Sequence, residues 1–567
     1  MATPAQPRES AASPDGEHPE HDVIVVGYGP VGAAAACLLG RYGVRTLVIE
    51  RAAAILEAHR AIALDHEALR VLQLAGLPPD AFATVRIPQV RMLSPQLGLF
   101  ARMDTSAERD GHPQLVTFYQ PELERALRAR AESHSNVRVQ LQTTLLEYRE
   151  AEHSVQATLQ HADGTRHRVS ARYLLAADGS NSMLRRAIGQ AFRGRTYAQD
   201  WLVVDVRNAP KPIDHVEFLC DHRRPTPHMV APGGRQRWEF MLRPGERPEE
   251  MESLESVRRL IAPWGDVEQM QIERRAVYRF HARCCDAFQK GRVFLAGDAA
   301  HITPPFIGQG LVAGLRDVAN LCWKLAWVTR GQAAPQLLAT YDVERRPHAK
   351  AMIRLAQVMG KLVMPESAPR ALATHGLMRL VRSLPLLARR LEHNDIKPPN
   401  RFRRGLLVRG RAGGELVRGG LFPQALVRDA SGRLLPSDDA LGPSLVCVGL
   451  DVDLDECVSS ETRSAFQACG GRFVQLHSLG ACAHGYTDIT GTFARKLRSG
   501  RIAVVRPDRA LLHDGPAHRA ERVLSESMRL LAQPQKESDH AARASLRIRA
   551  EGPMGATAER SHHADSG

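Results

Sequence analysis

The chain contains 567 residues, with 76 Lys and Arg against 62 Asp and Glu, and its formal net charge at pH 7 is +14. A chain of this length exceeds what one hydrophobic core supports, so we expect several domains. The basic residues are scattered along the sequence rather than clustered. This pattern argues against a nucleic-acid partner, although a basic surface attracts anionic small molecules.

Residues 1–20 are polar and rich in proline, without the apolar stretch of a signal peptide, and residues 531–567 have a similar composition. We therefore expect two disordered tails. No uncharged apolar run is long enough to cross a membrane, so we expect a cytoplasmic protein without membrane contact. The nine cysteines show neither a C-x-x-C motif nor another metal-ligand spacing, which favours free thiols and no metal site.

The segment "HDVIVVGYGPVGAAAACLLGRYGVRTLVIER" at 21–51 reads as a strand, a glycine-rich turn, a helix and a second strand that ends in an acid. In G-x-G-x-x-G, the first glycine allows a tight turn, the second lets a pyrophosphate approach the backbone, and the third lets helix and strand pack closely. The terminal acid is placed to accept hydrogen bonds from a ribose diol. The segment therefore predicts a dinucleotide-binding domain. Its expected binding residues are Gly27, Gly29, Pro30, Val31, Gly32, Glu50 and Arg51.

The segments that follow do not continue as the further strand and helix units of a nicotinamide dehydrogenase. Residues 57–77 show an amphipathic helical pattern with Arg60 near its start. Residues 117–134 show another, with Pro121 at the helix start. Several strand-like segments come next, with turn signals between them.

Two acid and glycine pairs then follow apolar strand-like runs, Asp178 with Gly179 and Gly297 with Asp298. The second pair opens "GDAAHITPPFIGQGLVAGLRD", in which prolines and glycines precede a helix that begins near Leu311. A plain strand-to-helix turn is one interpretation. The other is a backbone that must approach a ligand closely, where a Cβ atom would interfere.

Taken together, these three motifs resemble those of the class A flavoprotein aromatic hydroxylases. The resemblance implies FAD as the cofactor, with its adenosine end at the first motif and its flavin end at the third. It implies that the acid of the third motif accepts hydrogen bonds from the ribityl hydroxyls, and that backbone N–H groups of the turn and the start of the helix face the flavin ring. The binding residues implied in the second and third motifs are Asp178, Gly179, Gly297, Asp298, Pro305, Gly308, Gln309 and Gly310.

Finer matches, such as "RAIALDHEALR" (60–70), "YQPELERALRA" (119–129) and "RWEFMLRPGE" (237–246), look like the 3-(3-hydroxyphenyl)propionate/3-hydroxycinnamate hydroxylases. The resemblance spans about residues 21–530. The chain departs from the pattern at Val312, where such enzymes often carry a polar residue that contacts the flavin.

The implied reaction uses NADH and O2 to hydroxylate a phenolic acid next to its phenol hydroxyl, in aromatic compound catabolism. Because no second dinucleotide motif is present, NADH would dock only transiently. Two alternatives stay open. The enzyme acts on another phenol, such as a polyketide or a resorcinol, or the protein is a flavoprotein that does not oxygenate its ligand.

For single residues, the resemblance leaves two roles open. Arg60 reaches an FAD phosphate or ribose, or it is a solvated charge at a helix end. Gln120 lies beside the flavin, or it caps the following helix. We expect His301 to be a packing or hydrogen-bonding residue rather than a base, and no catalytic side chain is identified. The candidates for holding a substrate carboxylate, with a surface role as the alternative, are Arg223, His228 and Arg237.

The implied fold class is α/β, with a discontinuous Rossmann-like FAD-binding domain, a mainly antiparallel substrate domain and a C-terminal thioredoxin-like domain. The last domain lacks C-x-x-C, so we expect a role in packing or in a homo-oligomer rather than in redox chemistry. The helical bridge before it includes "RLVRSLPLLARRLEH" at 379–393. The expected boundaries are 21–90, 110–190 and 285–345 for the FAD-binding domain, 91–109 and 191–284 for the substrate domain, 346–414 for the bridge and 415–530 for the last domain.

Overall fold

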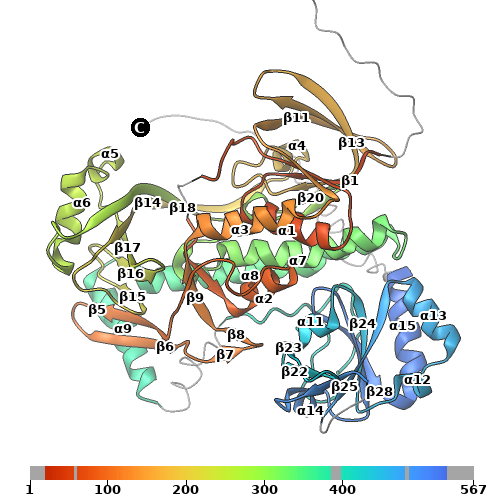
Figure 1. The fold of residues 1–567 in the computed structure, drawn as a ribbon. Coiled ribbons are helices and arrows are strands. Elements are labelled where there is room, and N and C mark those ends of the chain that lie inside the picture. The colour runs from red at the N-terminus through yellow and green to blue at the C-terminus, as the bar shows by residue number, and fades with distance from the viewer. Residues whose placement is uncertain (1–18, 57–59, 385–396, 479–483, 533–567) are drawn as a thin grey trace, which may run out of the picture.

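The computed structural model describes residues 19–56, 60–384, 397–478 and 484–532. The predicted tails lie almost wholly outside these residues, as do Cys482 and part of the helix predicted at 379–393. Three large sheets organise the described chain, and Figure 1 shows the third sheet set apart from the other two. Within the described ranges, no helix combines the length and the apolar character needed to cross a membrane.

The first sheet collects strands from three distant parts of the chain. Its path runs β10-β2-β1-β13-β12-β11, and β20 pairs with β13. The central strands are parallel and β12 and β11 are antiparallel. β1 is mostly apolar because it is buried between two parallel neighbours. The bounds are β1 His21–Val26, β2 Thr46–Ile49, β10 Val137–Gln140, β11 Thr143–Glu150, β12 Val155–His161, β13 Arg166–Ala176, β19 Gln289–Lys290 and β20 Val293–Leu295.

Helix α1 packs against the first two strands of this sheet and against α3 and α7, and α7 in turn packs against α2 and α8. Figure 1 shows α7 and α8 running through the middle of the molecule. The bounds are α1 Pro30–Arg41, α2 His66–Leu74, α3 Gln120–Glu132, α4 Met183–Ala187, α7 Gly310–Thr329, α8 Thr340–Val363 and α9 Ala368–Arg382.

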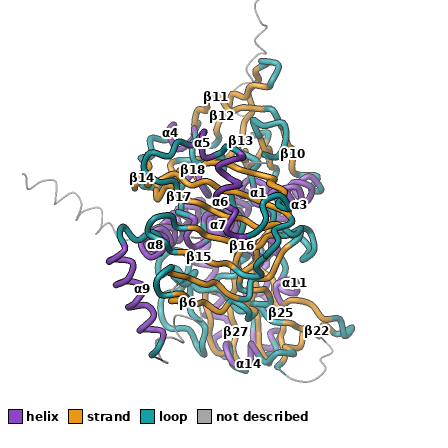
Figure 2. Tube along the Cα trace, turned by 90° about the vertical axis from the view of Figure 1, so that its left-hand side faces the viewer, coloured by secondary structure: helices purple, strands orange, loops and turns teal. Residues whose placement is uncertain are grey.

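The second sheet follows the order β21-β18-β14-β17-β16-β15-β5-β6 and is antiparallel except where β15 meets β5. Apolar residues on one of its faces pack against α5 and α6, and Figure 2 shows α6 beside β14, β17 and β18. The bounds are β5 Gln89–Ser94, β6 Gly98–Asp104, β14 Phe192–Arg207, β15 Val216–Leu219, β16 Thr226–Ala231, β17 Arg235–Met241, β18 Gln271–Cys285, β21 His301–Ile302, α5 Pro248–Met251 and α6 Leu254–Ile261.

The helix predicted over residues 57–77 is wrong at its start. Residues Ala63–Asp65 form β3, which pairs with β9, and α2 begins only at His66. The carboxylate of Asp65 accepts a hydrogen bond from the Ala68 N–H at 2.9 Å and so caps the helix. Arg60 therefore lies in a loop and not on a helix. The remaining small strands are β4 Thr84–Arg86, β7 Glu108–Arg109, β8 His112–Pro113 and β9 Leu115–Phe118.

The third sheet follows the order β23-β22-β26-β25-β24-β27-β28. β24 is parallel to β25 across a helical connection and antiparallel to β27, which pairs with β28 before the final helix. This βαβ unit followed by a ββα unit is the thioredoxin-like arrangement. The bounds are β22 Leu426–Asp429, β23 Leu434–Pro436, α11 Ser437–Leu441, β24 Leu445–Leu450, α12 Leu454–Cys457, α13 Ser460–Ala468, β25 Gly471–His477, β26 Tyr486–Asp488, α14 Thr492–Lys496, β27 Arg501–Val505, β28 Leu511–Pro516 and α15 Ala520–Ala532.

Buried ion pairs join this last domain to the rest of the chain. The Glu344 carboxylate on α8 accepts two hydrogen bonds from the Arg506 guanidinium, both at 2.9 Å, and one from Lys324 at 2.7 Å. Asp438 accepts two from Arg70, at 2.7 and 2.9 Å. Burial alone would raise the pKa of the Glu344 carboxyl, but Arg506 and Lys324 lower that pKa to about 2. The interface therefore depends on charged groups that satisfy one another.

Candidate functional site

The first and second glycine motifs meet at Gly27. Its φ angle is +100°, and a Cβ atom there would lie 2.4 Å from the carbonyl oxygen of Ala177, the residue before the second motif. A Cβ atom on Gly32 would lie 2.0 Å from the carbonyl oxygen of Gly27. At Gly29, by contrast, a Cβ atom would meet nothing within 4 Å. Gly27 and Gly32 thus serve close backbone packing, whereas Gly29 leaves open space beside the start of α1.

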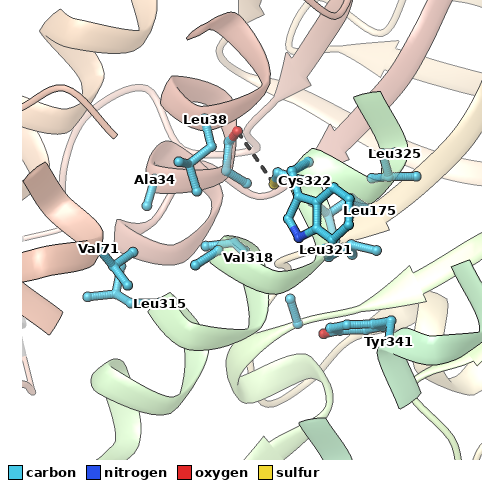
Figure 3. Close-up of a cluster of buried hydrophobic side chains, with 14 of the residues drawn as sticks. Ala34, Leu38, Val71, Leu175, Leu315, Val318, Leu321, Cys322, Leu325 and Tyr341 are labelled. Carbon is cyan, nitrogen blue, oxygen red and sulfur yellow. Dashed lines mark hydrogen bonds between the residues drawn. The ribbon is translucent and has the colours of Figure 1, made fainter. Parts of the chain in front are cut away.

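The third motif joins them through Val31. A Cβ atom on Gly314 of α7 would lie 2.6 Å from Cγ2 of Val31 and 3.0 Å from Cα of Gly297. Figure 3 shows the apolar side of the same helix, where Val318 of α7 faces Ala34 and Leu38 of α1. The three motifs, far apart in the sequence, therefore form one rigid unit in which the N-termini of α1 and α7 lie close together.

Glu50 directly follows β2 and is held by two backbone groups. Its carboxylate accepts hydrogen bonds from the Tyr28 N–H at 2.7 Å and the Ala52 N–H at 2.9 Å. Each carboxylate oxygen has a second lone pair and remains able to accept a ribose hydroxyl. Arg51 is exposed.

Asp178 carries an unsatisfied buried atom. Its Oδ2 accepts a hydrogen bond from the Met183 N–H at 2.9 Å, whereas its buried Oδ1 has no partner within the described residues. Burial raises the pKa of the Asp178 carboxyl. Gly179 follows with φ at +77°, and a Cβ atom there would meet nothing within 4 Å. A buried acceptor beside open backbone is what a hydroxyl-bearing ligand would complete.

Asp298 is a second carboxylate that lacks hydrogen-bond donors among the described residues. It is half-buried, and no group in the described part of the chain donates a hydrogen bond to it. Burial raises the pKa of the Asp298 carboxyl, and the Arg60 guanidinium opposes that shift. The turn that follows contains exposed Pro305 and Gly308, whose φ of +60° is the left-handed region. α7 then begins at Gly310 with no side-chain cap, so its first N–H groups are free to face a ligand.

The Gln309 side chain points into a buried network instead of the site. Its Nε2 donates to Asp65 at 3.1 Å, and its Oε1 accepts from Arg316 at 2.9 Å. Asp65 also accepts from Arg316 at 2.9 Å. Only the backbone of Gln309 is therefore free for a ligand, as the interpretation of a backbone that approaches a ligand closely requires.

Gln120 fastens the loop that carries Arg60. Its Oε1 accepts hydrogen bonds from the N–H groups of Arg60 and Ala61, at 3.1 and 3.0 Å. Tyr119 stands at the N-cap position of α3, so the alternative role of Gln120 as the helix cap is wrong. The Arg60 guanidinium lies over the ring of Tyr278, 5.3 Å from its centroid, and is drawn toward the second sheet instead of being a free charge at a helix end.

His301 is a buried hydrogen-bonding residue. Its Nε2 lies 2.7 Å from Oδ2 of Asp317, and that same oxygen accepts the Gly297 N–H at 3.1 Å. The other oxygen of Asp317 accepts from Arg345 at 3.0 Å. This network stabilises the turn of the third motif from its buried side, as expected for a packing or hydrogen-bonding role.

The three candidates for a substrate carboxylate are all paired. Arg237 is buried and donates to Asp205 at 2.6 and 2.9 Å, and buried His228 stacks on Trp238 with ring centroids 4.4 Å apart. The surface role is therefore wrong for both. Arg223 is exposed and pairs with a neighbouring acid.

One polar residue of the second sheet escaped the sequence analysis. Glu239 is 8% exposed and, within the described residues, has no hydrogen bond or ion pair. The signal lay in "RQRWEFM", where charged residues alternate with Trp238 and Phe240. In a strand this alternation places the charges on one face, and a charged face on an otherwise buried strand indicates a polar ligand.

The observed groups fit FAD. Open space at Gly29 beside a helix N-terminus suits a pyrophosphate. Glu50, Asp178 and Asp298 offer carboxylate oxygens to ribose and ribityl hydroxyls, and the uncapped start of α7 suits the electron-accepting edge of the ring. No group of three or more potential metal ligands occurs within the described residues.

Comparisons with known proteins agree with this geometry. Residues 20–356 match the family described as FAD binding domain, and residues 419–530 match the HcaD C-terminal domain. The chain is 38% identical over 504 residues to 3-(3-hydroxy-phenyl)propionate/3-hydroxycinnamic acid hydroxylase 2 of Burkholderia vietnamiensis, covering 86% of this chain and 92% of the relative. The 3-(3-hydroxy-phenyl)propionate/3-hydroxycinnamic acid hydroxylase of Comamonas testosteroni is 31% identical over 587 residues, covering 93% of this chain and 99% of the relative.

Among solved structures, the flavin-dependent monooxygenase PieE in complex with FAD and substrate is similar, with a TM-score of 0.75 at 21% identity, covering 91% of this chain and all of the other. Aklavinone-11 hydroxylase with FAD and aklavinone gives a TM-score of 0.71 at 23% identity, covering 90% and 99% of the two chains. These likenesses concern the fold. The predicted fold class, family and FAD cofactor are confirmed, while the domain boundaries and the roles of single binding residues stay predictions.

Proposed function

Because this chain belongs to the FAD-dependent aromatic hydroxylases, we propose that it uses NADH and O2 to hydroxylate 3-(3-hydroxyphenyl)propionate and 3-hydroxycinnamate at the carbon next to the phenol hydroxyl. The products are 3-(2,3-dihydroxyphenyl)propionate and 2,3-dihydroxycinnamate. The observation that carries the substrate assignment is the 38% identity, over 92% of its length, to a relative of that name.

On this proposal, the first motif holds the adenosine and pyrophosphate end of FAD, with Glu50 on the ribose. Asp178 and Asp298 accept hydrogen bonds from hydroxyls along the cofactor, and the start of α7 approaches the ring. When bound, FAD would pass two electrons from NADH to dioxygen, so that one oxygen atom enters the phenol ring and the other leaves as water. We also propose an FAD-binding domain of residues 21–90, 110–190 and 285–345 and a substrate domain of residues 91–109 and 191–284. A helical bridge of residues 346–414 and a last domain of residues 415–530 follow.

The protein side chains contribute orientation and exclusion of water. Phe306 follows the third motif and packs on Trp201 of the second sheet, with ring centroids 5.9 Å apart. Trp201 stacks on Phe280 at 5.3 Å, and Tyr197 completes the cluster against Phe306 at 5.9 Å. These aromatic side chains form an apolar layer between the turn of the third motif and the second sheet. Such a layer excludes water, which favours transfer of oxygen to the substrate over unproductive reduction of O2.

The test is a panel of phenols given to the purified, FAD-loaded protein with NADH. We expect NADH oxidation to rise strongly with 3-(3-hydroxyphenyl)propionate, and the catechol product to match the NADH consumed. A different phenol that is preferred would keep the enzyme class and change the substrate. NADH oxidation that no phenol stimulates would instead favour a flavoprotein that does not oxygenate.

A further inference from the structure

The two faces of β17 differ in character. The face toward α5 and α6, called outward, is apolar, and the opposite face, called inward, is charged. Arg235, Arg237 and Glu239 alternate with Trp238 and Phe240. Trp238 and Phe240 belong to the apolar cluster that contains α5 and α6. The charged side chains must then point to the other side of the sheet, toward the FAD-binding part of the chain.

Two contacts bracket Glu239 on that face. On one side, the Arg237 guanidinium donates to the carbonyl oxygen of Arg60 at 3.2 Å, in the loop that precedes β3. On the other side, the next inward position of β17 pairs with Trp201, whose ring contacts Phe306 of the third-motif turn. Glu239 therefore lies between two segments that flank the proposed flavin site.

The neighbouring polar groups on this face satisfy one another. Asp205 on β14 accepts hydrogen bonds from Arg237 at 2.6 and 2.9 Å and from Arg274 of β18 at 3.3 Å. Arg274 also donates to the hydroxyl of Tyr278. Glu239 has no such partner in the described part of the chain, although it is 8% exposed. The Glu239 oxygens are not sealed from solvent, so a ligand group that supplies a donor can reach this largely buried carboxylate and offset its desolvation.

Electrostatics at this position favour a basic carboxylate. Burial raises the pKa of the Glu239 carboxyl, and Asp205 adds to that shift, while Arg237 and Arg274 oppose it. This side also carries Tyr278, the Arg60 guanidinium over its ring, and the ion pair of Arg235 with Glu273. A carboxylate of raised pKa takes a proton more readily at neutral pH than an ordinary glutamate does.

We propose that Glu239 accepts the hydrogen bond of the substrate's phenol hydroxyl and takes its proton as the ring is oxygenated. This inference rests on the proposed function. The phenol O–H bond breaks, a bond from hydrogen to a Glu239 carboxylate oxygen forms, and the electron pair stays on the phenol oxygen. The ring carbon next to that oxygen becomes more electron-rich, which is the position that receives the new hydroxyl.

The first test is a binding cycle that needs no turnover. The oxidised holoenzyme, without NADH, is titrated with 3-(3-hydroxyphenyl)propionate and with 3-phenylpropionate, and the change in flavin absorbance gives each Kd. Wild type should bind the hydroxylated acid about tenfold or more tightly, since a hydrogen bond to a charged group is worth roughly that much. In Glu239→Ala this preference should disappear while FAD content stays at one per chain.

A matched control is Glu217→Gln on β15. Glu217 lies on the opposite face of the same sheet, because it pairs in register with His228 and so with Trp238. This variant should keep the wild-type preference for the hydroxylated acid.

The second test separates proton transfer from simple contact. Glu239→Gln keeps a hydrogen-bond acceptor but takes up no proton, so KM should change little while kcat falls by about 100-fold or more. The decline of wild-type kcat at acidic pH should also vanish in this variant. Full preference for the hydroxylated acid in Glu239→Ala, or an unchanged kcat in Glu239→Gln, would overturn the assignment. A wild-type enzyme that hydroxylates no phenol would overturn the proposed function instead.

Discussion

Buried carboxylates behave differently in two regions of this molecule. At the contact with the C-terminal domain, Glu344 and Asp438 are paired with arginines, and their pKa values are lowered in spite of burial. Around the proposed flavin and substrate site, Asp178, Asp298 and Glu239 are left without a full set of donors, and burial raises their pKa values. Within the described residues, the first region is complete as protein alone, whereas we propose that ligands complete the second.

The comparison separates structural acids from functional ones. Both kinds are buried and both are perturbed, so neither property alone identifies a site. The presence or absence of protein donors decides between them. This distinction predicts opposite consequences when each kind of acid is removed.

The largest effect is expected at the domain contact. Glu344→Gln removes the acid of Lys324 and leaves Arg506 paired with Asp508 alone, and should lower the apparent free energy of unfolding by about 3–5 kcal/mol. A urea titration followed by circular dichroism measures this loss. A decrease below about 1 kcal/mol would mean that water reaches the network and that the contrast between the two regions is wrong.

The same acid sets a pH dependence. The pKa of Glu344 in the folded protein is about 2, below its ordinary value of 4.5. Its contribution to stability is therefore fully present above about pH 4.5 and is lost as the pH falls toward 2. Glu344→Gln should lack this part of the acid sensitivity.

The next effect concerns the cofactor. Asp298→Ala removes a carboxylate to which no described residue donates a hydrogen bond, so the fold should be unchanged while FAD binding weakens by about 1.5–3 kcal/mol, or roughly tenfold or more in Kd. Flavin fluorescence during reconstitution of the apoprotein gives the Kd. Asp286→Ala, at an exposed ion-paired acid nearby, is the control. Equal Kd values for wild type and Asp298→Ala would refute the role of Asp298.

Two glycines offer a sharper contrast within one turn. Gly29→Ala adds a methyl group that meets no protein atom within 4 Å, whereas Gly32→Ala places one 2.0 Å from the Gly27 carbonyl oxygen. The first variant should keep wild-type stability and weaken FAD binding by about 1–3 kcal/mol through overpacking against the pyrophosphate. The second should lose stability as well. Normal FAD binding by a well-folded Gly29→Ala protein would place the pyrophosphate elsewhere.

The smallest effect has the opposite sign. Glu239→Gln removes an unpaired buried charge and should stabilise the apoprotein at neutral pH by about 1 kcal/mol. Since the folded pKa of Glu239 is raised, wild type loses stability as the pH rises through that pKa, and the gain in the variant should shrink on acidification. Thermal melts at several pH values measure the difference, and a destabilised variant would argue for a structural role.

The sequence predicted the features that depend on local patterns. The strand, turn and helix of residues 21–51 and the turn at 297–310 are encoded by glycine, proline and apolar spacing, and the fold class they imply is confirmed. The start of α2 was missed because β3 is stabilised by pairing with β9, about fifty residues away.

Long-range contacts were outside the reach of such patterns. The Gln309 side chain bonds to Asp65 across 244 positions, and Arg506 bonds to Glu344 across 162. Glu239 is distinguished by having no hydrogen-bond or ion-pair partner among the described residues, which only the folded arrangement reveals. Residue types identified the motifs, but the pairing of buried charges required the structure.

We propose above all that this protein inserts oxygen from O2 into a phenolic acid. The most direct test supplies the FAD-loaded enzyme with NADH, 3-(3-hydroxyphenyl)propionate and isotopically labelled dioxygen, followed by mass spectrometry of the product. We predict 3-(2,3-dihydroxyphenyl)propionate with one labelled atom, in the new hydroxyl. Label that enters only when the water is labelled, or NADH consumed without any hydroxylated product from this acid, would contradict the account.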